Sequence, residues 1–217
     1  MESNKAIALD AHCGHRGQAY IRFDYSGHGA SGGAFEEGTI TRWLEESLAV
    51  FRSQTEGPQI VVGSSMGGYL ALLLARALDR AGEAGRLAGM ALVAPAVDFT
   101  EALIWNHLPE AARRTLRETG AWQRPSAYSS EPYPITRTLI EDGRKHLILG
   151  QDIVRSHCPV RILQGMQDED VPYRHAMTLI EHMAADPVAL TLIRDGEHRL
   201  SRPQDLTLLM EAVDAFG

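Results

Sequence analysis

The chain has 217 residues, 44% of them hydrophobic and 23% charged, which is typical of a folded globular protein with a substantial core. Its formal net charge of −7, without a lysine- or arginine-rich block, argues against a nucleic-acid-binding surface. No apolar run approaches the roughly 18 uncharged residues of a membrane span. Residues 1–12 include acidic and polar residues where a signal peptide needs a basic start and an apolar run.

The chain contains two cysteines, Cys13 and Cys158, far apart in sequence. A reducing, cytoplasmic location is the default expectation for such a chain. His12 and His15 flank Cys13, but further ligands at metal-finger spacing do not follow, so we expect no metal site there. The length favours a single domain over residues 1–217.

Helix and strand patterns alternate through the first part of the chain. Helices are predicted over residues 5–16, over residues 40–51 with Thr39 as N-cap, and from residue 66 onward, and strands over residues 19–25, 60–62 and 86–94. Such alternation predicts an α/β fold: a mostly parallel sheet with right-handed crossovers and helices on both faces.

The loop after the predicted strand 19–25 fits a dinucleotide-binding pattern. Gly27, Gly29 and Gly32 have the spacing G-x-G-x-x-G. That fingerprint requires a helix to open directly from the loop, whereas further glycines intervene before any helical periodicity begins. In that fingerprint an acidic residue that binds the ribose also ends a second strand, about 20 residues after the glycines. Here the acidic residues at that distance, Glu45 and Glu46, fall inside a predicted helix. We therefore expect no nucleotide cofactor.

Residues 63–67, Gly-Ser-Ser-Met-Gly, fit the pattern G-x-S-x-G between a strand and a helix. This pattern is typical of a nucleophile elbow, a sharp turn that presents its central side chain at the helix N-terminus and requires small residues two positions before and after it. Ser65 is therefore the candidate nucleophile. The alternative is an ordinary glycine-rich turn.

The alternation breaks over residues 97–150, where aromatic residues and proline-containing turns predict an insertion of short helices. This insertion either covers Ser65 as a lid and lines an apolar pocket for an acyl chain, or packs against the side of the sheet. Beyond it, strands are predicted over residues 158–163 and 188–193, a helix beginning at Pro172, and a final helix capped by Ser201 with Pro203 in its first turn.

Two further polar residues follow strands at the edge where Ser65 is expected. Asp168 comes first after the strand 158–163, and His198 follows the strand 188–193. The order serine, acid, histidine is that of the hydrolase triad, in which the histidine takes the serine proton and the carboxylate orients the imidazole. Glu169 and Asp170 compete for the acid role. We favour Asp168, because Asp170 is placed to cap the next helix.

Four stretches of the chain, FDYSGHGASGG, VGSSMGG, QGMQDEDVPY and GEHRLS, resemble corresponding stretches of α/β-hydrolases. The resemblance covers nearly the whole chain and points to the subgroup of the mitochondrial palmitoyl-protein thioesterase and acyl-glucuronide esterase. It implies the α/β-hydrolase fold, serine esterase or thioesterase activity without cofactor, and Ser65, Asp168 and His198 as triad. It also implies that the Met66 N–H is one oxyanion donor.

The start of the chain departs from this family. A crossover helix connects two parallel strands, yet residues 5–16 have no strand before them. The resemblance implies that the missing strand is central and that the loop after it supplies a second oxyanion N–H. We expect Met1 to be an internal methionine of a longer natural chain.

The function predicted is hydrolysis of a carboxylic ester or thioester through an acyl-enzyme on Ser65. A lyase or C–C hydrolase using the same triad is a second enzymatic hypothesis. The alternative from another class is a non-catalytic binding module of the same fold, or an inactive truncated fragment. The expected partner is an acyl ester or thioester, and the sequence makes no prediction of oligomeric state.

Overall fold

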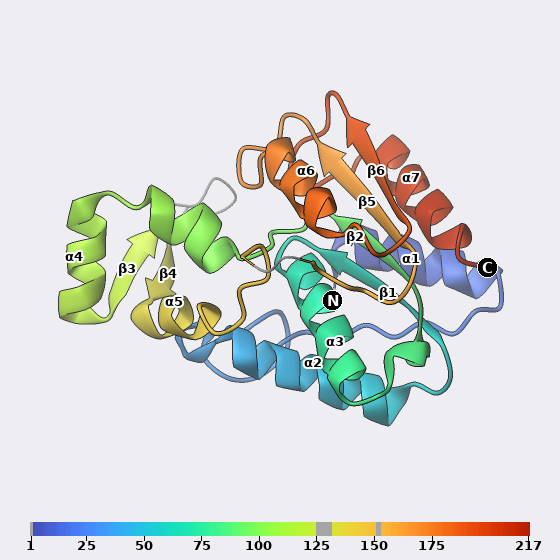
Figure 1. Ribbon diagram of the computed structural model, residues 1–217, viewed down its shortest axis with the longest axis horizontal. Coiled ribbons are helices and arrows are strands. Elements are labelled where there is room, and N and C mark those ends of the chain that lie inside the picture. Colours follow the sequence, from blue (N-terminus) through green and yellow to red (C-terminus); the bar gives the residue numbers. More distant parts are fainter. Residues whose placement is uncertain (1, 125–131, 151–152) are drawn as a thin grey trace.

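A computed structural model describes residues 2–124, 132–150 and 153–217 of the chain. Its centre is a four-stranded parallel sheet in the order β1-β2-β5-β6 (Figure 1). The strands are β1 (Gln59–Ser64), β2 (Leu87–Val93), β5 (Val160–Gly165) and β6 (Val188–Ile193). The predicted parallel sheet is confirmed, and each of its strands lies where a short apolar run predicts one.

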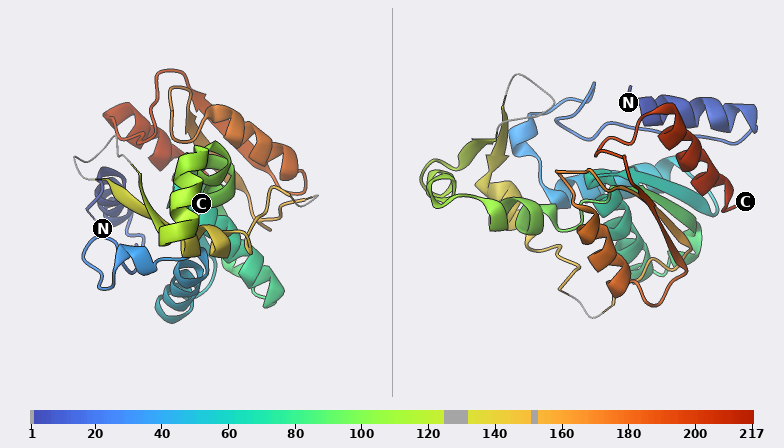
Figure 2. Two further views of the ribbon diagram at one scale, coloured as in Figure 1. Left: turned by 90° about the vertical axis from the view of Figure 1, so that its left-hand side faces the viewer. Right: turned by 90° about the horizontal axis from the view of Figure 1, so that it is seen from above.

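Helices cover both faces of this sheet (Figure 2). One face carries α1 (Asn4–His15) and α7 (Pro203–Asp214), and the other carries α2 (Ile40–Gln54), α3 (Met66–Arg80) and α6 (Tyr173–His182). The apolar stripe of each helix predicts this packing: Leu9 of α1 and Leu209 of α7 share a core with the inner strands. Among the described residues, none of the helices has the length and apolar character to cross a bilayer.

Two helix starts test the predicted caps. The Thr39 side chain accepts a hydrogen bond from the Arg42 N–H at 3.1 Å, so that cap is confirmed. The predicted Ser201 cap is wrong: α7 begins after Arg202, whose N–H donates to the Asp205 carboxylate at 3.0 Å. The buried Asp205 also accepts from the Arg202 guanidinium, which fixes the helix start one residue later than Ser201 would.

The predicted strand over residues 19–25 is wrong. The segment lies beside the sheet without strand hydrogen bonding, and a groove separates it from β1. A strand depends on a neighbour that completes its backbone hydrogen bonds, so apolar and β-branched composition alone does not produce one. No described strand pairs with β1 on this side.

The insertion over residues 97–150 forms a separate lobe beyond the end of the sheet (Figure 1). It contains a π-helical turn (Thr100–Ile104), a 3₁₀ turn (Trp105–His107), α4 (Glu110–Thr119), the antiparallel pair β3 (Ala121–Arg124) and β4 (Tyr133–Thr136), and α5 (Arg137–Gly143). The short helices are confirmed, whereas the β3–β4 pair was not predicted. Proline turns were expected at residues 124–126 and 130–134; residues 125–131 lie outside the described residues, while Arg124 ends β3 and Tyr133 and Pro134 begin β4.

Two buried carboxylates attach this lobe to the rest of the fold. Asp98, at its beginning, accepts hydrogen bonds from the N–H groups of Ile148 and Leu149 at its end, both at 2.9 Å. Asp142 accepts from the N–H of Thr41, in α2, at 2.8 Å. Burial favours a higher pKa for Asp142, but the hydrogen bonds from Thr41 and Lys145 outweigh it and hold the pKa below the usual carboxyl value.

The turn between β1 and α3 gives a test with a matched control. A Cβ on Gly63 would overlap the carbonyl of Gly67 and lie 2.7 Å from the Gly68 nitrogen, whereas a Cβ on Gly67 meets nothing within 4 Å. We expect Gly63→Ala to lower the free energy of unfolding by about 1–3 kcal/mol or more. Gly67→Ala should not lower it. Denaturant unfolding of both variants measures this, and equal effects would contradict the packing described.

Candidate active site

The backbone of Ser65 is the first element of the site. It has φ 54° and ψ −120°, a strained conformation for a residue other than glycine. The Ser65 N–H donates to the Val93 carbonyl at 2.8 Å, and the Ala96 N–H donates to the Ser65 carbonyl at 3.1 Å. These bonds hold the turn between β1 and α3, so the predicted sharp strand-to-helix turn is confirmed.

Of the three residues predicted to act together, His198 lies within hydrogen-bond distance of both of the others. His198 Nε2 lies 3.0 Å from the Ser65 Oγ, and His198 Nδ1 lies 2.8 Å from the Asp168 Oδ2. The Asp168 side chain is fully buried, and that of His198 is 16% exposed. Because the carboxylate faces Nδ1, that nitrogen carries the proton and Nε2 presents its lone pair to the serine hydroxyl.

The structure also distinguishes between the three neighbouring acids. Asp168 Oδ1 accepts hydrogen bonds from the N–H groups of Asp170, at 3.0 Å, and Val171, at 2.8 Å, which direct Oδ2 toward His198. The predicted helix cap by Asp170 is wrong, since α6 follows Pro172 and has no side-chain cap. The Asp170 carboxylate instead lies 4.0 Å from the Arg124 guanidinium. Glu169 is exposed.

Gln164 is a contact of Asp168 that the sequence analysis missed. Its side chain is fully buried at the end of β5, and its Nε2 lies 3.1 Å from the Asp168 Oδ2 and 2.9 Å from the Val171 carbonyl. The Asp168 carboxylate therefore receives a donor from the strand as well as from its own loop. A polar side chain within the apolar run of this strand was the available signal.

A cavity of about 400 Å³ opens beside Ser65 and His198. Most of its lining is apolar. From the main fold come His28, Phe35, Trp43 and Met66, and from the insertion Phe99, Leu103, Ile104, Arg124, Tyr133, Ile135 and Leu139. Phe35 and Tyr133 stack edge to face with ring centroids 6.4 Å apart, which joins the two halves of the lining. Burial raises the pKa of Tyr133, so its phenol is neutral.

Met66 is the first residue of α3, so its N–H has no partner within the helix. This N–H follows Ser65 directly, and Met66 lines the same cavity. The positive end of the α3 dipole also lies here, because the helix begins at this point. The position therefore has the chemistry to receive negative charge that develops next to the serine oxygen.

Two clusters contain side chains of metal-ligating type. Asp168, Asp170 and His198 offer ligand atoms within 4.8 Å of one another, but Asp168 and His198 are already hydrogen-bonded together. In the other cluster, Cys13 is buried with its pKa raised by burial, while His12 Nε2 lies 2.8 Å from an Asp214 carboxylate oxygen. Hydrogen bonds and burial therefore account for both arrangements.

The chain matches the model of the alpha/beta hydrolase family over residues 6–207. It is 36% identical to the bovine (Bos taurus) palmitoyl-protein thioesterase ABHD10, mitochondrial, over 99% of this chain and 68% of that protein. This relative is named mitochondrial, so the cytoplasmic location expected from the sequence is not confirmed.

Solved structures agree with this assignment. The crystal structure of a putative hydrolase from Agrobacterium vitis S4 has a TM-score of 0.95 and 50% identity, over 100% of this chain and 83% of that one. Alpha/beta hydrolase domain-containing protein 10 from mouse has a TM-score of 0.87 and 33% identity, over 99% of this chain and 84% of that one. The chain belongs to the alpha/beta hydrolase family and is an enzyme that hydrolyses ester bonds.

Proposed function

We propose that this protein is a serine hydrolase that cleaves acyl esters or thioesters through a covalent acyl-enzyme on Ser65. The observation that carries the proposal is the continuous set of contacts from Ser65 Oγ to His198 and from His198 to the buried Asp168. A serine hydroxyl is a weak nucleophile at neutral pH, and an oriented imidazole is the group that activates it.

In the first half of the reaction, Ser65 Oγ attacks the acyl carbonyl carbon while its proton passes to His198 Nε2. The carbonyl electron pair moves to the oxygen, and the Met66 N–H donates to this oxyanion. Asp168 stabilises the imidazolium through the hydrogen bond at Nδ1. When the intermediate collapses, the bond to the leaving alcohol or thiol breaks, and the leaving atom takes the proton from Nε2.

The second half repeats these steps with water. His198 Nε2 takes a proton from a water molecule, whose oxygen attacks the acyl carbon. Collapse of this second intermediate breaks the ester bond to Ser65, and Nε2 returns the proton to the serine oxygen. The products are a carboxylic acid and the free enzyme.

Because the cavity is lined mostly by apolar side chains, it is suited to bind an apolar acyl group of the substrate. Its volume of about 400 Å³ falls in the lower part of the usual range for small-molecule sites, roughly 300–1,000 Å³. Because residues of the insertion form much of the wall, the insertion acts as a lid over the acyl group. The name of the bovine relative, a palmitoyl-protein thioesterase, favours a fatty acyl thioester as the physiological substrate.

The nucleophile is tested with a fluorophosphonate probe and the adjacent serines. Labelling should disappear in Ser65→Ala and persist in Ser64→Ala, because of these two serines it is Ser65 whose Oγ lies 3.0 Å from His198 Nε2. Ester turnover should fall by at least about 1,000-fold in Ser65→Ala. No labelling of the folded wild-type protein would instead support a non-catalytic binding module, and labelling that survives in Ser65→Ala would assign the nucleophile to another residue.

Gln164 provides a test of how Asp168 is positioned. Gln164→Leu removes the donor to Asp168 Oδ2 and leaves the buried Val171 carbonyl without that partner. We expect it to lower the free energy of unfolding by about 1–3 kcal/mol and to reduce turnover. Gln167→Leu is the control, because this side chain is exposed, and its effect should stay within about 0.5 kcal/mol. Equal unfolding curves for the two variants would contradict the role given to Gln164.

The acyl pocket is tested by filling it. Leu103→Trp should reduce kcat/KM for long acyl chains by about tenfold or more relative to acetyl, because Leu103 lines the cavity. Ala111→Trp, at an exposed position on α4 outside the cavity, should leave the chain-length preference unchanged. Nitrophenyl esters and acyl thioesters of graded length measure both effects. An unchanged dependence of kcat/KM on chain length in Leu103→Trp would exclude this cavity as the acyl site.

The same substrates test the thioester preference in the wild-type protein. Equal rates for esters and thioesters would exclude that preference.

A further inference from the structure

The glycine-rich loop over residues 26–33 is closely packed, and the proposed reaction steps do not use it. A Cβ on Gly27 would lie 2.7 Å from the Phe35 Cα, and a Cβ on Gly29 would overlap the Asp24 carboxylate. Both glycines have positive φ, 73° and 52°, which other residues rarely adopt. The packing of the loop thus requires these two glycines of the G-x-G-x-x-G pattern, and His28 is the residue between them.

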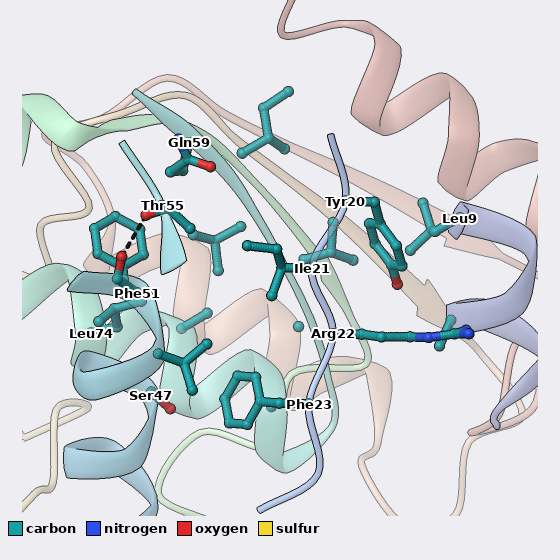
Figure 3. A pocket seen from close by; sticks show the side chains of 18 of the residues that line it. Leu9, Tyr20, Ile21, Arg22, Phe23, Ser47, Phe51, Thr55, Gln59 and Leu74 are labelled. Atoms are coloured by element: carbon teal, nitrogen blue, oxygen red, sulfur yellow. Dashed lines mark hydrogen bonds between the residues drawn. The ribbon is translucent and has the colours of Figure 1, made fainter. Parts of the chain in front are cut away.

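Backbone hydrogen bonds hold His28 from both sides. Its N–H donates to the Tyr25 carbonyl at 2.9 Å, and its carbonyl accepts from the Ser31 N–H at 3.0 Å. The segment before the loop is anchored to α2. Figure 3 shows the Phe23 side chain on the side of this segment that faces Ser47 of α2, and the Tyr25 hydroxyl lies 3.2 Å from the Ser47 Oγ. His28 therefore has a fixed position in the fold.

Aromatic rings and one hydrogen bond orient the His28 imidazole. It packs edge to face against Phe35 and Trp43, each with ring centroids 5.2 Å apart, and against Tyr25 at 6.2 Å. Its Nδ1 lies 3.1 Å from the Ser26 carbonyl oxygen. Because a carbonyl oxygen accepts and never donates, Nδ1 carries a proton, and in the neutral ring Nε2 is then the acceptor. These contacts determine both the orientation of the ring and its tautomer.

His28 lines the acyl cavity together with Ser65 and His198. Among the described residues its Nε2 makes no hydrogen bond, and this atom is not one of the polar atoms sealed from solvent. Two other polar residues of the lining, Arg124 and Tyr133, contact each other, with the guanidinium 5.8 Å from the centre of the phenol ring. His28 thus places at the cavity wall a hydrogen-bond acceptor that the proposed reaction steps do not use.

An acceptor in this position affects which substrates bind. A substrate that fills the cavity displaces the water that would otherwise donate to Nε2, and an acceptor left without a donor disfavours binding. Sites that hydrogen-bond an N–H or O–H of the substrate strongly reject an analogue that lacks it. The hydrocarbon chain of a fatty acyl group has no such donor, so the donor belongs to the leaving group.

We propose that His28 is a specificity-determining residue whose Nε2 accepts a hydrogen bond from an N–H or O–H group of the leaving group. This inference rests on the proposed acyl transfer to Ser65, because it concerns the leaving group of that reaction. The preferred substrates are then thioesters or esters with an amide N–H or a hydroxyl close to the scissile bond. An acylated cysteine within a peptide has such an amide, and a partial ester of a polyol has such a hydroxyl.

The experiment compares four octanoyl thioesters in two matched pairs. The thiols of the first pair are N-acetylcysteamine and its N-methyl derivative, which lacks the N–H. Those of the second pair are mercaptoethanol and its methyl ether, which lacks the O–H. Release of thiol gives kcat/KM for each substrate. We expect the wild-type protein to prefer the donor-bearing member of at least one pair by about tenfold, and the pair that shows this preference identifies the donor. Ratios near one in both pairs would overturn the proposal.

Variants of His28 assign the preference to Nε2. In His28→Phe, which keeps an aromatic ring, the ratio within the pair should fall to within about twofold of one. The Ser26 carbonyl keeps the Trp43 Nε1 donor at 3.2 Å, so this substitution does not leave it unpaired. His28→Gln, whose amide oxygen accepts hydrogen bonds, should restore part of the ratio.

Phe35→Leu is the matched control. It changes a ring in contact with His28 and keeps Nε2, so both rates should fall together and the ratio within the pair should persist. A ratio that persists in His28→Phe would contradict the assignment to Nε2. A ratio lost as fully in Phe35→Leu would also contradict it, because the shape of the wall would then determine the preference.

Binding to Ser65→Ala separates this inference from the proposed reaction. The variant cannot form the acyl-enzyme, so calorimetry measures the dissociation constants of the same thioesters while they stay intact. A donor preference in binding, without thiol release by the wild-type protein, would refute acyl transfer to Ser65 and support the role of His28. Thiol release without a donor preference in either measurement would refute the role of His28 and leave the proposed function standing.

Discussion

The backbone of Ser65, held at φ 54° between β1 and α3, is the constraint on which the rest of the site depends. It directs one hydroxyl away from the sheet, at the edge where the loops after β5 and β6 bring Asp168 and His198. Local strain of this size costs roughly 1–3 kcal/mol and persists only where surrounding structure enforces it. Here the enforcing elements are the close approach of Gly63 to Gly67 and the hydrogen bonds to Val93 and Ala96.

Much of this arrangement could be predicted from the sequence, because short apolar runs and helical periodicity mark the elements. The positions of Ser65, Asp168 and His198 directly after strands then predict that they meet, since parallel strands end at one edge. The helix caps at Ser201 and Asp170 were predicted wrongly. In each case a competing local interaction, Asp205 with the Arg202 N–H or Asp168 with the N–H groups of its own loop, determines the geometry.

The remaining differences have separate causes. Residues 19–25 have strand composition, but a strand forms only beside a partner at hydrogen-bond distance, and here a groove intervenes. The β3–β4 pair escaped prediction because its strands are four residues long and one contains Pro134. Gln164 stands out as a polar residue in an apolar strand, but its contact with Asp168 is what identifies its role.

The hydrogen bonds of Asp98 have a consequence for how proteins of this family diversify. Because its carboxylate binds the N–H groups of Ile148 and Leu149, the lobe leaves the sheet and returns to it at nearly the same point. Length and sequence between those two points can change during evolution without altering the spacing of the strands or the reacting groups. New acyl preferences can thus arise by exchange of one peripheral module while the chemistry stays constant.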